Sequence, residues 1–296
     1  MSQTDPIIAA GTHRYGFRRD WARLPRWWGF GTDAPGPRPP QTAVQGAVAA
    51  NGDVYVLARA PHPVTVFDGA GNFVSSWGEG RFTPFVHGIR IAPDGAIWIT
   101  DAGNHTLTEH TPDGRVLRVL GTPDFPAPTL AGNPFNMPTG VAFASNGDLY
   151  VSDGYGNRRV HCFAPDLARR HSWGGPGTGP GEFALVHYIE IDAKDRIYIC
   201  DRENQRIQIF DLAGSHLADW TGFLAPSDLA FGADSIVVGA QDGLTIWSLD
   251  RALLAQFPRD VAGADSLNIH GVWLDAAENI YLAMFDRTVS KLTRIS

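Results

Sequence analysis

The chain has 296 residues, 44% of them hydrophobic, with 33 glycines and 21 prolines. This composition is typical of many short strands joined by tight turns, and it disfavours a helical or a disordered protein. The net charge of −7 argues against a nucleic-acid partner, which normally requires a basic surface. All-β chains of this length are often a single domain, so we expect one domain over residues 1–296.

The chain carries no signal that would place it in or across a membrane. Its N-terminus lacks the basic segment and apolar core of a secretory signal, and no stretch approaches the ~20 apolar residues of a membrane span. Cys162 and Cys200 fall on strands of different repeat units, so we expect them to be reduced and buried. These features predict a cytoplasmic protein without a membrane partner.

Six copies of a strand–turn–strand pattern follow one another along the chain. The pattern is clearest at residues 89–101, where a Pro-Asp-Gly turn separates two apolar strands, and two further strands follow at 106–110 and 116–120. The copies begin at Val48, Ile89, Val141, Ile189, Leu229 and Val272, with spacings of 41, 52, 48, 40 and 43 residues. Apolar alternation bounded by turn residues at this period predicts an all-β, six-bladed β-propeller.

The two ends of the chain complete each other in this prediction. The last unit reaches Ser296 with three strands at most, whereas residues 13–22 contain a strand that belongs to no unit. Closing a ring requires the last blade to take a strand from the other terminus, which removes an open edge. We therefore expect residues from about Arg14 to Trp21 to close the sixth blade.

Three histidines precede the first strand of alternate units: His87, His187 and His270. The other units have Gly46, Thr139 and Ser227 at that point. In a ring of six blades the three imidazoles would lie about 120° apart around one axis. Three convergent imidazoles with an open fourth position suit a catalytic metal site. Zinc fits best, although iron and copper also accept such ligands.

We expect structural roles for several other histidines and aspartates and for a glycine-rich segment. Five histidines lack the threefold pattern and are expected to be structural or exposed: His62, His105, His110, His161 and His171, with His105 on a third strand. Asp101, Asp153 and Asp201 recur at the end of second strands and are expected to cap turns. The glycine-rich segment 174–181 lacks the strand-to-helix context of a phosphate loop, so it reads as a connection between blades.

The geometry of a blade brings the start of its first strand and the end of its second strand to one mouth of the channel. The residues after the second strands are Arg59, Ala102, Gly154-Tyr155, Arg202, Gln241 and Phe285. The longest insertion, residues 122–138, would cover this mouth as a lid.

Three segments, Ser152–Val160, Cys200–Gln208 and Trp98–His105, resemble the NHL-repeat propeller of peptidyl-α-hydroxyglycine α-amidating lyases. The resemblance implies that His87, His187 and His270 bind zinc. It also implies that Tyr155, Arg59 and Arg202 complete an active site that splits a carbinolamide into an amide and glyoxylate.

Two positions depart from the family pattern. Gly271 stands where the family has an aspartate that helps to hold a structural calcium ion, so calcium is not expected to be held by a side chain there. Gly156 follows Tyr155, where secreted animal members form a disulfide. These departures suggest a distant bacterial-type relative whose substrate need not be a peptide.

The sequence thus favours a zinc-dependent lyase acting on a small molecule. Tyr155 would be the base, Arg59 and Arg202 would hold a carboxylate, and Gln241 and Phe285 would complete the substrate site. A hydrolase or hydratase would use the same residues, and a non-catalytic NHL scaffold would use none of them. A gluconolactonase-like enzyme centres its metal on carboxylates and asparagine, a set that is missing at this mouth.

Overall fold

The computed structural model describes residues 5–31, 42–261 and 266–295. In these ranges the protein is all-β, with antiparallel sheets and one short 3₁₀ helix, and it is a six-bladed β-propeller as predicted. None of the helices in the described ranges is long and apolar enough to cross a membrane. The chain divides into two compact units: residues 77–227, called the central unit here, and residues 1–76 with 228–296, called the terminal unit.

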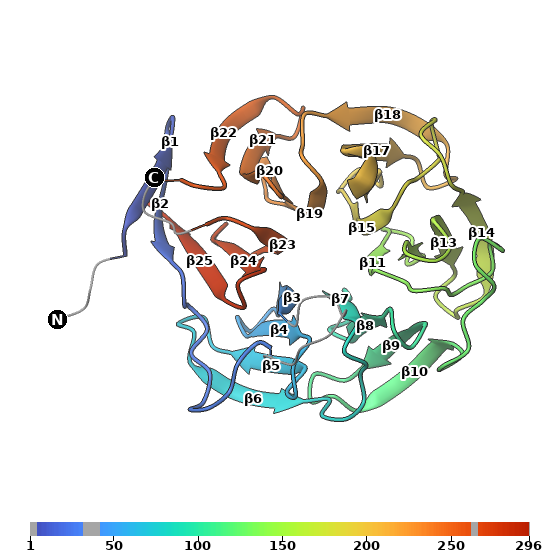
Figure 1. Ribbon diagram of the computed structural model, residues 1–296, viewed down its shortest axis with the longest axis horizontal. Helices are drawn as coiled ribbons and strands as arrows, with labels where there is room; N and C mark the ends of the chain where they lie inside the picture. The colour runs from blue at the N-terminus through green and yellow to red at the C-terminus, as the bar shows by residue number, and fades with distance from the viewer. Residues whose placement is uncertain (1–4, 32–41, 262–265, 296) are drawn as a thin grey trace. The chain divides into compact units, whose positions relative to one another are not determined.

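The central unit contains three four-stranded sheets, each with its strands in chain order (Figure 1). The second blade is β7 (Val86–Ile91), β8 (Ile97–Asp101), β9 (Thr106–His110) and β10 (Val116–Gly121). The third is β11 (Gly140–Phe143), β12 (Leu149–Asp153), β13 (Arg159–Phe163) and β14 (Arg169–Gly174). The fourth is β15 (Val186–Ile191), β16 (Ile197–Asp201), η1 (Arg202–Asn204), β17 (Arg206–Phe210) and β18 (His216–Thr221). The first strand of the third blade, β11, contacts both β7 and β15.

The terminal unit contains the other three sheets. The first blade is β3 (Ala43–Val48), β4 (Val54–Ala58), β5 (Val64–Phe67) and β6 (Phe73–Trp77). The fifth is β19 (Pro226–Phe231), β20 (Ser235–Ala240), β21 (Gly243–Ser248) and β22 (Leu253–Pro258). The sixth has β23 (Ile269–Leu274), β24 (Ile280–Met284) and β25 (Val289–Arg294), joined by β1 (Ile7–Ala10) and β2 (His13–Arg18).

The N-terminal segment completes the sixth blade, as predicted. Strand β2 pairs antiparallel with β25, so that Phe17 faces Leu292, and the backbone N–H of Trp21 donates to the carbonyl of Val289 over 3.0 Å. Strand β1, which was not anticipated, pairs with β2 as a fifth and outermost strand. Phe17 and Ile8 are both buried, so the hairpin adds apolar core as well as backbone hydrogen bonds.

The second strands of the blades are the most deeply buried, and only Ser235 at the start of β20 is partly exposed. In β8, β12 and β16 every residue is buried. Such strands read as continuous apolar runs because both faces of the blade are covered. Cys162 and Cys200 are free thiols in this core, as expected.

The aspartates at the ends of these strands act as turn caps, as predicted. The Asp101 carboxylate accepts the backbone N–H groups of Thr83 and Gly103, at 2.7 and 3.1 Å. Asp201 likewise accepts the N–H of Ala184 at 3.0 Å. Burial raises the pKa of Asp101, while these hydrogen bonds favour its ionised form.

Candidate metal centre

Each of the three predicted metal ligands lies at a β-bulge. In β7 the pairing passes from Val86↔Asp101 to Gly88↔Thr100, which leaves His87 as the extra residue. His187 in β15 and His270 in β23 are the extra residues of the same irregularity. A bulge turns a side chain out of the regular alternation of a strand. The bulge therefore frees each histidine from pairing and redirects its ring.

The first blade carries the same bulge without a histidine. In β3 the pairing passes from Ala43↔Ala58 to Gln45↔Leu57, so Val44 occupies the equivalent position. The prediction that Gly46 fills this position was wrong by two residues. Alternation of apolar residues does not reveal where a strand gains an unpaired residue.

The same hydrogen bond orients all three rings. Nδ1 of His87 lies 2.9 Å from the carbonyl oxygen of Thr139, Nδ1 of His187 lies 2.7 Å from that of Ser227, and Nδ1 of His270 lies 2.8 Å from that of Val44. A carbonyl only accepts, so each Nδ1 carries the proton and each Nε2 carries the lone pair. This leaves Nε2 as the nitrogen that can bind a metal.

The central unit brings two predicted ligands and the predicted base together. The ring centroids of His87 and His187 are 4.8 Å apart. The hydroxyl of Tyr155 lies 3.1 Å from Nε2 of His87 and, given the tautomer, donates to it. Phe85 packs beside Tyr155, with ring centroids 5.2 Å apart. Three of the predicted site residues therefore form one cluster.

In the terminal unit, His270 is buried against Phe285, one of the predicted substrate residues. Their ring centroids are 5.1 Å apart in an edge-to-face arrangement. Phe285 is partly exposed, and its backbone N–H donates to the carbonyl of Asn268 over 3.0 Å. Phe285 thus lies directly beside one predicted ligand.

Among the described residues, His87 and His187 of the central unit and His270 of the terminal unit each offer one ring nitrogen as a possible metal ligand. All three are buried. Neutral imidazoles whose second nitrogen donates to a carbonyl are the usual form of histidine in metal sites. The donor set therefore fits a divalent metal such as zinc.

Two glycines that flank Tyr155 determine where it lies. A Cβ atom on Gly154 would lie 1.8 Å from the carbonyl oxygen of Val186, the residue before His187. A Cβ atom on Gly156 would lie 2.0 Å from Oδ1 of Asn136. Only glycine permits approaches this close. The sequence showed the glycines but not this role.

The insertion predicted as a lid is fastened to the loop that carries Tyr155. Gly156 donates its N–H to the carbonyl of Asn136 over 3.0 Å and accepts the N–H of Leu130 over 3.1 Å. The N–H of Asn136 reaches the carboxylate of Asp153 at 2.9 Å. The 122–138 segment thus holds the residues on either side of Tyr155 by hydrogen bonds.

The predicted arginines and Gln241 lie at the ends of their second strands. Arg59 follows β4 and is buried, with its backbone N–H bonded to the carbonyl of Thr42 over 2.9 Å. Arg202 opens η1, and its guanidinium donates two hydrogen bonds to the Glu203 carboxylate, at 2.9 and 2.7 Å. Gln241 follows β20 and is exposed.

The histidines outside the threefold pattern have structural partners. His161 is buried between Asp153 and Ser172, at 3.1 and 2.7 Å. The placement of His105 on a third strand was wrong. It lies in the turn before β9 with a φ of 57°, and its Nδ1 accepts the N–H of Met137 over 3.2 Å.

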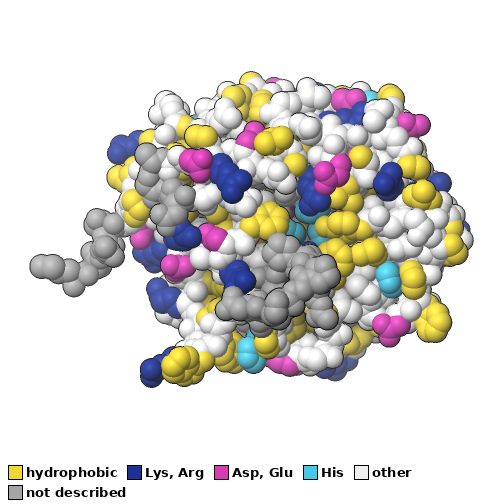
Figure 2. All heavy atoms as spheres, in the orientation of Figure 1, with side chains coloured by type: hydrophobic (Ala, Val, Ile, Leu, Met, Phe, Trp, Pro, Cys, Tyr) yellow, Lys and Arg dark blue, Asp and Glu magenta, His cyan; other side chains and the backbone are white. Residues whose placement is uncertain are grey.

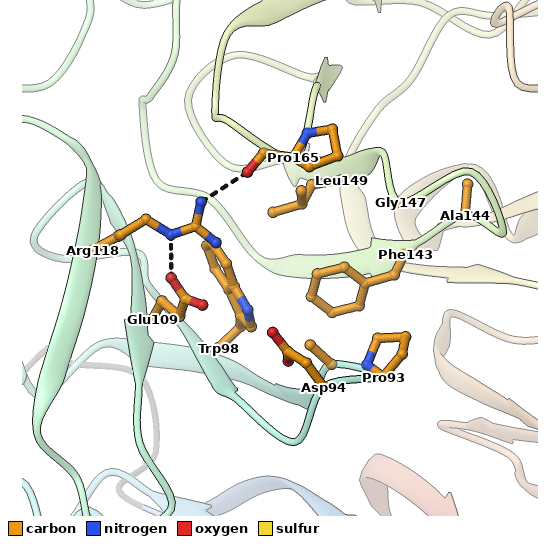
Figure 3. A pocket seen from close by; sticks show the side chains of 11 residues that line it. Pro93, Asp94, Trp98, Glu109, Arg118, Phe143, Ala144, Gly147, Leu149 and Pro165 are labelled. Atoms are coloured by element: carbon orange, nitrogen blue, oxygen red, sulfur yellow. Dashed lines mark hydrogen bonds and ion pairs between the residues drawn. The ribbon is translucent and has the colours of Figure 1, made fainter.

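A pocket of about 220 Å³ lies elsewhere in the central unit (Figure 3). Trp98 and Phe143 form its apolar walls, and Arg118 closes one side by pairing with Glu109 and donating to the Pro165 carbonyl. None of the predicted site residues lines it. Figure 2 shows that, on the face in view, acidic and basic side chains of the described residues are interspersed rather than gathered in a basic patch.

Comparisons with known proteins identify the repeat. The NHL repeat model matches residues 135–163 and 187–210, so the chain carries NHL repeats. The chain is 33% identical to human NHL repeat-containing protein 3 over 199 residues, which cover 62% of this chain and 57% of that protein. It therefore spans little more than half the length of that relative.

The resemblance to amidating lyases extends over part of the chain. A probable peptidyl-alpha-hydroxyglycine alpha-amidating lyase of Caenorhabditis elegans is 33% identical over 143 residues, which cover 46% of this chain and 39% of that protein. Among solved structures, virginiamycin B lyase from Staphylococcus aureus is similar with a TM-score of 0.60 and 17% identity, over 89% of this chain and 84% of that one. A likeness at that identity concerns the fold alone.

Proposed function

We propose that the protein is a metal-dependent lyase that cleaves a carbinolamide, such as an N-acyl-α-hydroxyglycine, into an amide and a carbonyl product such as glyoxylate. The observation that carries the proposal is the common anchoring of His87, His187 and His270, whose Nδ1 atoms all bond to carbonyl oxygens. Rings held in this way present Nε2 to one ion, and zinc is the metal that we favour.

When bound, the metal would lower the pKa of the substrate hydroxyl and leave it easier to deprotonate. The fit of this chain to the metal rests on the carbonyl oxygens that accept from Nδ1 of each histidine as well as on the histidines themselves. A carbonyl that accepts from Nδ1 fixes the ring and raises the basicity of Nε2. Three protein ligands also leave one position for substrate.

Tyr155 would accept the proton. Its hydroxyl lies 3.1 Å from Nε2 of His87, within reach of a group bound beside that nitrogen. A phenol ordinarily titrates near 10, and cationic neighbours favour its ionised form. The glycines beside Tyr155 and the fastened insertion keep the ring in this place.

The bond changes balance around the carbinol carbon. The hydroxyl proton passes to Tyr155, the carbon–nitrogen bond breaks as the carbon–oxygen double bond forms, and the departing amide nitrogen takes up the proton that Tyr155 accepted, which returns Tyr155 to its starting form. Arg59 and Arg202 would bind the carboxylate of the substrate, which for Arg202 means exchanging Glu203 for the ligand. That exchange costs little because Glu203 is 54% exposed and its ion pair with Arg202 is solvated. Phe285 and Gln241 would complete the substrate surface.

Two other functions remain as alternatives. A metal-dependent hydrolase or hydratase would use the same histidines, with water in place of the substrate hydroxyl. A non-catalytic scaffold is favoured by the similarity to NHL repeat-containing protein 3, but a scaffold does not require three buried histidines anchored alike. We propose no calcium ion held by a side chain at position 271, because a Cβ atom there would lie 2.4 Å from the Val44 carbonyl oxygen.

The test is an assay of products from N-benzoyl-α-hydroxyglycine. The lyase predicts benzamide and glyoxylate in equal amounts, activity that a chelator removes, and no activity in His187→Ala. The His171→Ala variant, altered outside the site, should remain active. Release of benzoate would favour the hydrolase, and the absence of any product would contradict the lyase.

A further inference from the structure

Side chains of β7 and β15 contact each other at two places in the central unit. At the first place His87 and His187 face each other, with ring centroids 4.8 Å apart. Three residues further along each strand, the guanidinium of Arg90 forms an ion pair with the carboxylate of Glu190. A His-x-x-Arg motif in β7 and a His-x-x-Glu motif in β15 therefore make two contacts, one between the histidines and one between the charged residues.

The bulges explain how residues three apart can face the same partner. In a regular strand such residues point to opposite faces. The extra residue at His87 and at His187 shifts this alternation, so that each histidine and the charged residue beyond it turn the same way. Strand β11 contacts both strands and has Gly140 at this point, where a Cβ atom would lie 3.0 Å from the Tyr188 ring.

Glu190 is the buried member of the ion pair. Its side chain is 4% exposed, whereas that of Arg90 is 33% exposed. Burial raises the pKa of Glu190, and the charge of Arg90 opposes that rise. Oε1 accepts from Arg90 and from the N–H of Ile191, and Oε2 has no hydrogen-bond partner among the described residues. The charged form of Glu190 thus depends on Arg90.

We propose that Arg90 and Glu190 are a positioning pair for the metal centre: they hold β7 to β15 at the spacing that lets one ion reach both His87 and His187. The inference rests on the proposed metal site but concerns residues that touch no metal. Removing the ion pair lets the two strands separate three residues beyond the histidines. Metal affinity then falls although every ligand is still present.

The chain supplies a matched control. Arg196 and Asp192 form another ion pair in the fourth blade, at 2.7 Å, with side-chain exposures of 33% and 7%. This pair lies in the turn between β15 and β16 and links no two blades. Arg196→Met and Arg90→Met therefore remove the same group from equally exposed pairs.

The first measurement is zinc affinity, by competition with a coloured chelator, together with the absorption spectrum of the cobalt-substituted protein. We expect Arg90→Met and Glu190→Gln to weaken zinc binding roughly 10- to 100-fold, the usual effect of losing a group behind a metal ligand, and to alter the cobalt spectrum. Arg196→Met should change neither. Arg90→Lys, which keeps the charge, should bind more tightly than Arg90→Met.

Zinc affinity equal to wild type in Arg90→Met and Glu190→Gln would overturn the proposal. So would a loss of zinc affinity in Arg196→Met as large as that in Arg90→Met, or equal losses in Arg90→Lys and Arg90→Met. Two further measurements distinguish failure of the positioning role from failure of the metal site. Zinc binding by wild type and His187→Ala tests the metal site, and hydrogen exchange of the metal-free proteins tests whether the ion pair holds the two strands. If wild type and His187→Ala bind zinc equally, the metal site is wrong, and so is the positioning role. Exchange would then show only whether the pair holds β7 and β15 together.

Discussion

The hydroxyl of Tyr155 donates a hydrogen bond to Nε2 of His87 over 3.1 Å. The direction of this bond follows from the other side of the ring, where Nδ1 is used by the carbonyl of Thr139. A metal on Nε2 would take the lone pair that the hydroxyl now uses. The proposed base and the proposed ligand are therefore joined by one hydrogen bond, and metal binding at Nε2 would free the Tyr155 hydroxyl from it.

Replacing Tyr155 by phenylalanine removes only the hydroxyl. If Tyr155 is the base, the variant should lose roughly 10²–10⁴ in kcat, the usual contribution of general base catalysis. Zinc content and thermal unfolding should stay near wild type, because His87 keeps its carbonyl partner. A rate within a few-fold of wild type would show that Tyr155 is not the base and would favour the hydrolase.

The Gly154→Ala variant tests how Tyr155 is held. The added methyl group would meet the Val186 carbonyl oxygen at 1.8 Å, so the loop must shift, at a cost of about 1–3 kcal/mol in the free energy of unfolding. The catalytic rate should fall even under conditions where the variant remains folded, because the shift of the loop moves Tyr155. Gly175→Ala is the control, since nothing lies within 4 Å of its Cβ position. Equal behaviour of the two variants in urea unfolding and in the assay would contradict this account.

The N-terminal hairpin makes a prediction about folding. Removing residues 1–25 would leave the edge of β25 unpaired and uncover the core beneath β2. We expect loss of cooperative urea unfolding. A truncated protein that unfolds like the full chain would show that the sixth blade does not need this strand.

Two single substitutions in the same hairpin refine that test. Phe17 is 4% exposed, so Phe17→Ala should cost about 3–5 kcal/mol in the free energy of unfolding. Ile7 is 52% exposed, and Ile7→Ala should change stability by no more than about 0.5 kcal/mol. Similar values for both would contradict the burial of the hairpin.

His110 predicts a dependence of stability on pH. Burial lowers its pKa from 6.5 to about 4, because the charged form is disfavoured in the folded protein. The unfolded chain therefore binds the proton more readily between these values, and stability falls as the pH drops from 6.5 to 4. The effect is at most about 3 kcal/mol. Urea unfolding of wild type and His110→Asn at pH 7 and pH 4.5 should show the larger fall in wild type, and parallel curves would contradict it.

The fold could be predicted from the sequence because strand alternation and turn residues repeat along it. Alternation gave the six blades and the closing strand, but not β1, whose short apolar segment carries no repeat. It also assigned Gly46 to the position equivalent to the histidines, which is occupied by Val44, because the unpaired residue of a bulge leaves no mark in a pattern of period two.

The site was predicted unevenly. The threefold spacing of His87, His187 and His270 singled out the histidines without any structure. The partners of the rings could not be predicted, since the carbonyls of Thr139, Ser227 and Val44 are backbone atoms that carry no residue signature. The roles of Tyr155, Arg59 and Arg202 came from the resemblance to a family, and the pairing of Arg90 with Glu190 depends on a bulge.

The most direct test of the account is the metal content of the purified protein, measured beside single alanine variants. We predict one zinc ion, or another divalent metal, per wild-type chain. That ion should be lost in each of His87→Ala, His187→Ala and His270→Ala, and retained in the control His171→Ala. A wild-type protein that takes up no divalent metal, or variants that retain it as wild type does, would contradict the proposed metal centre.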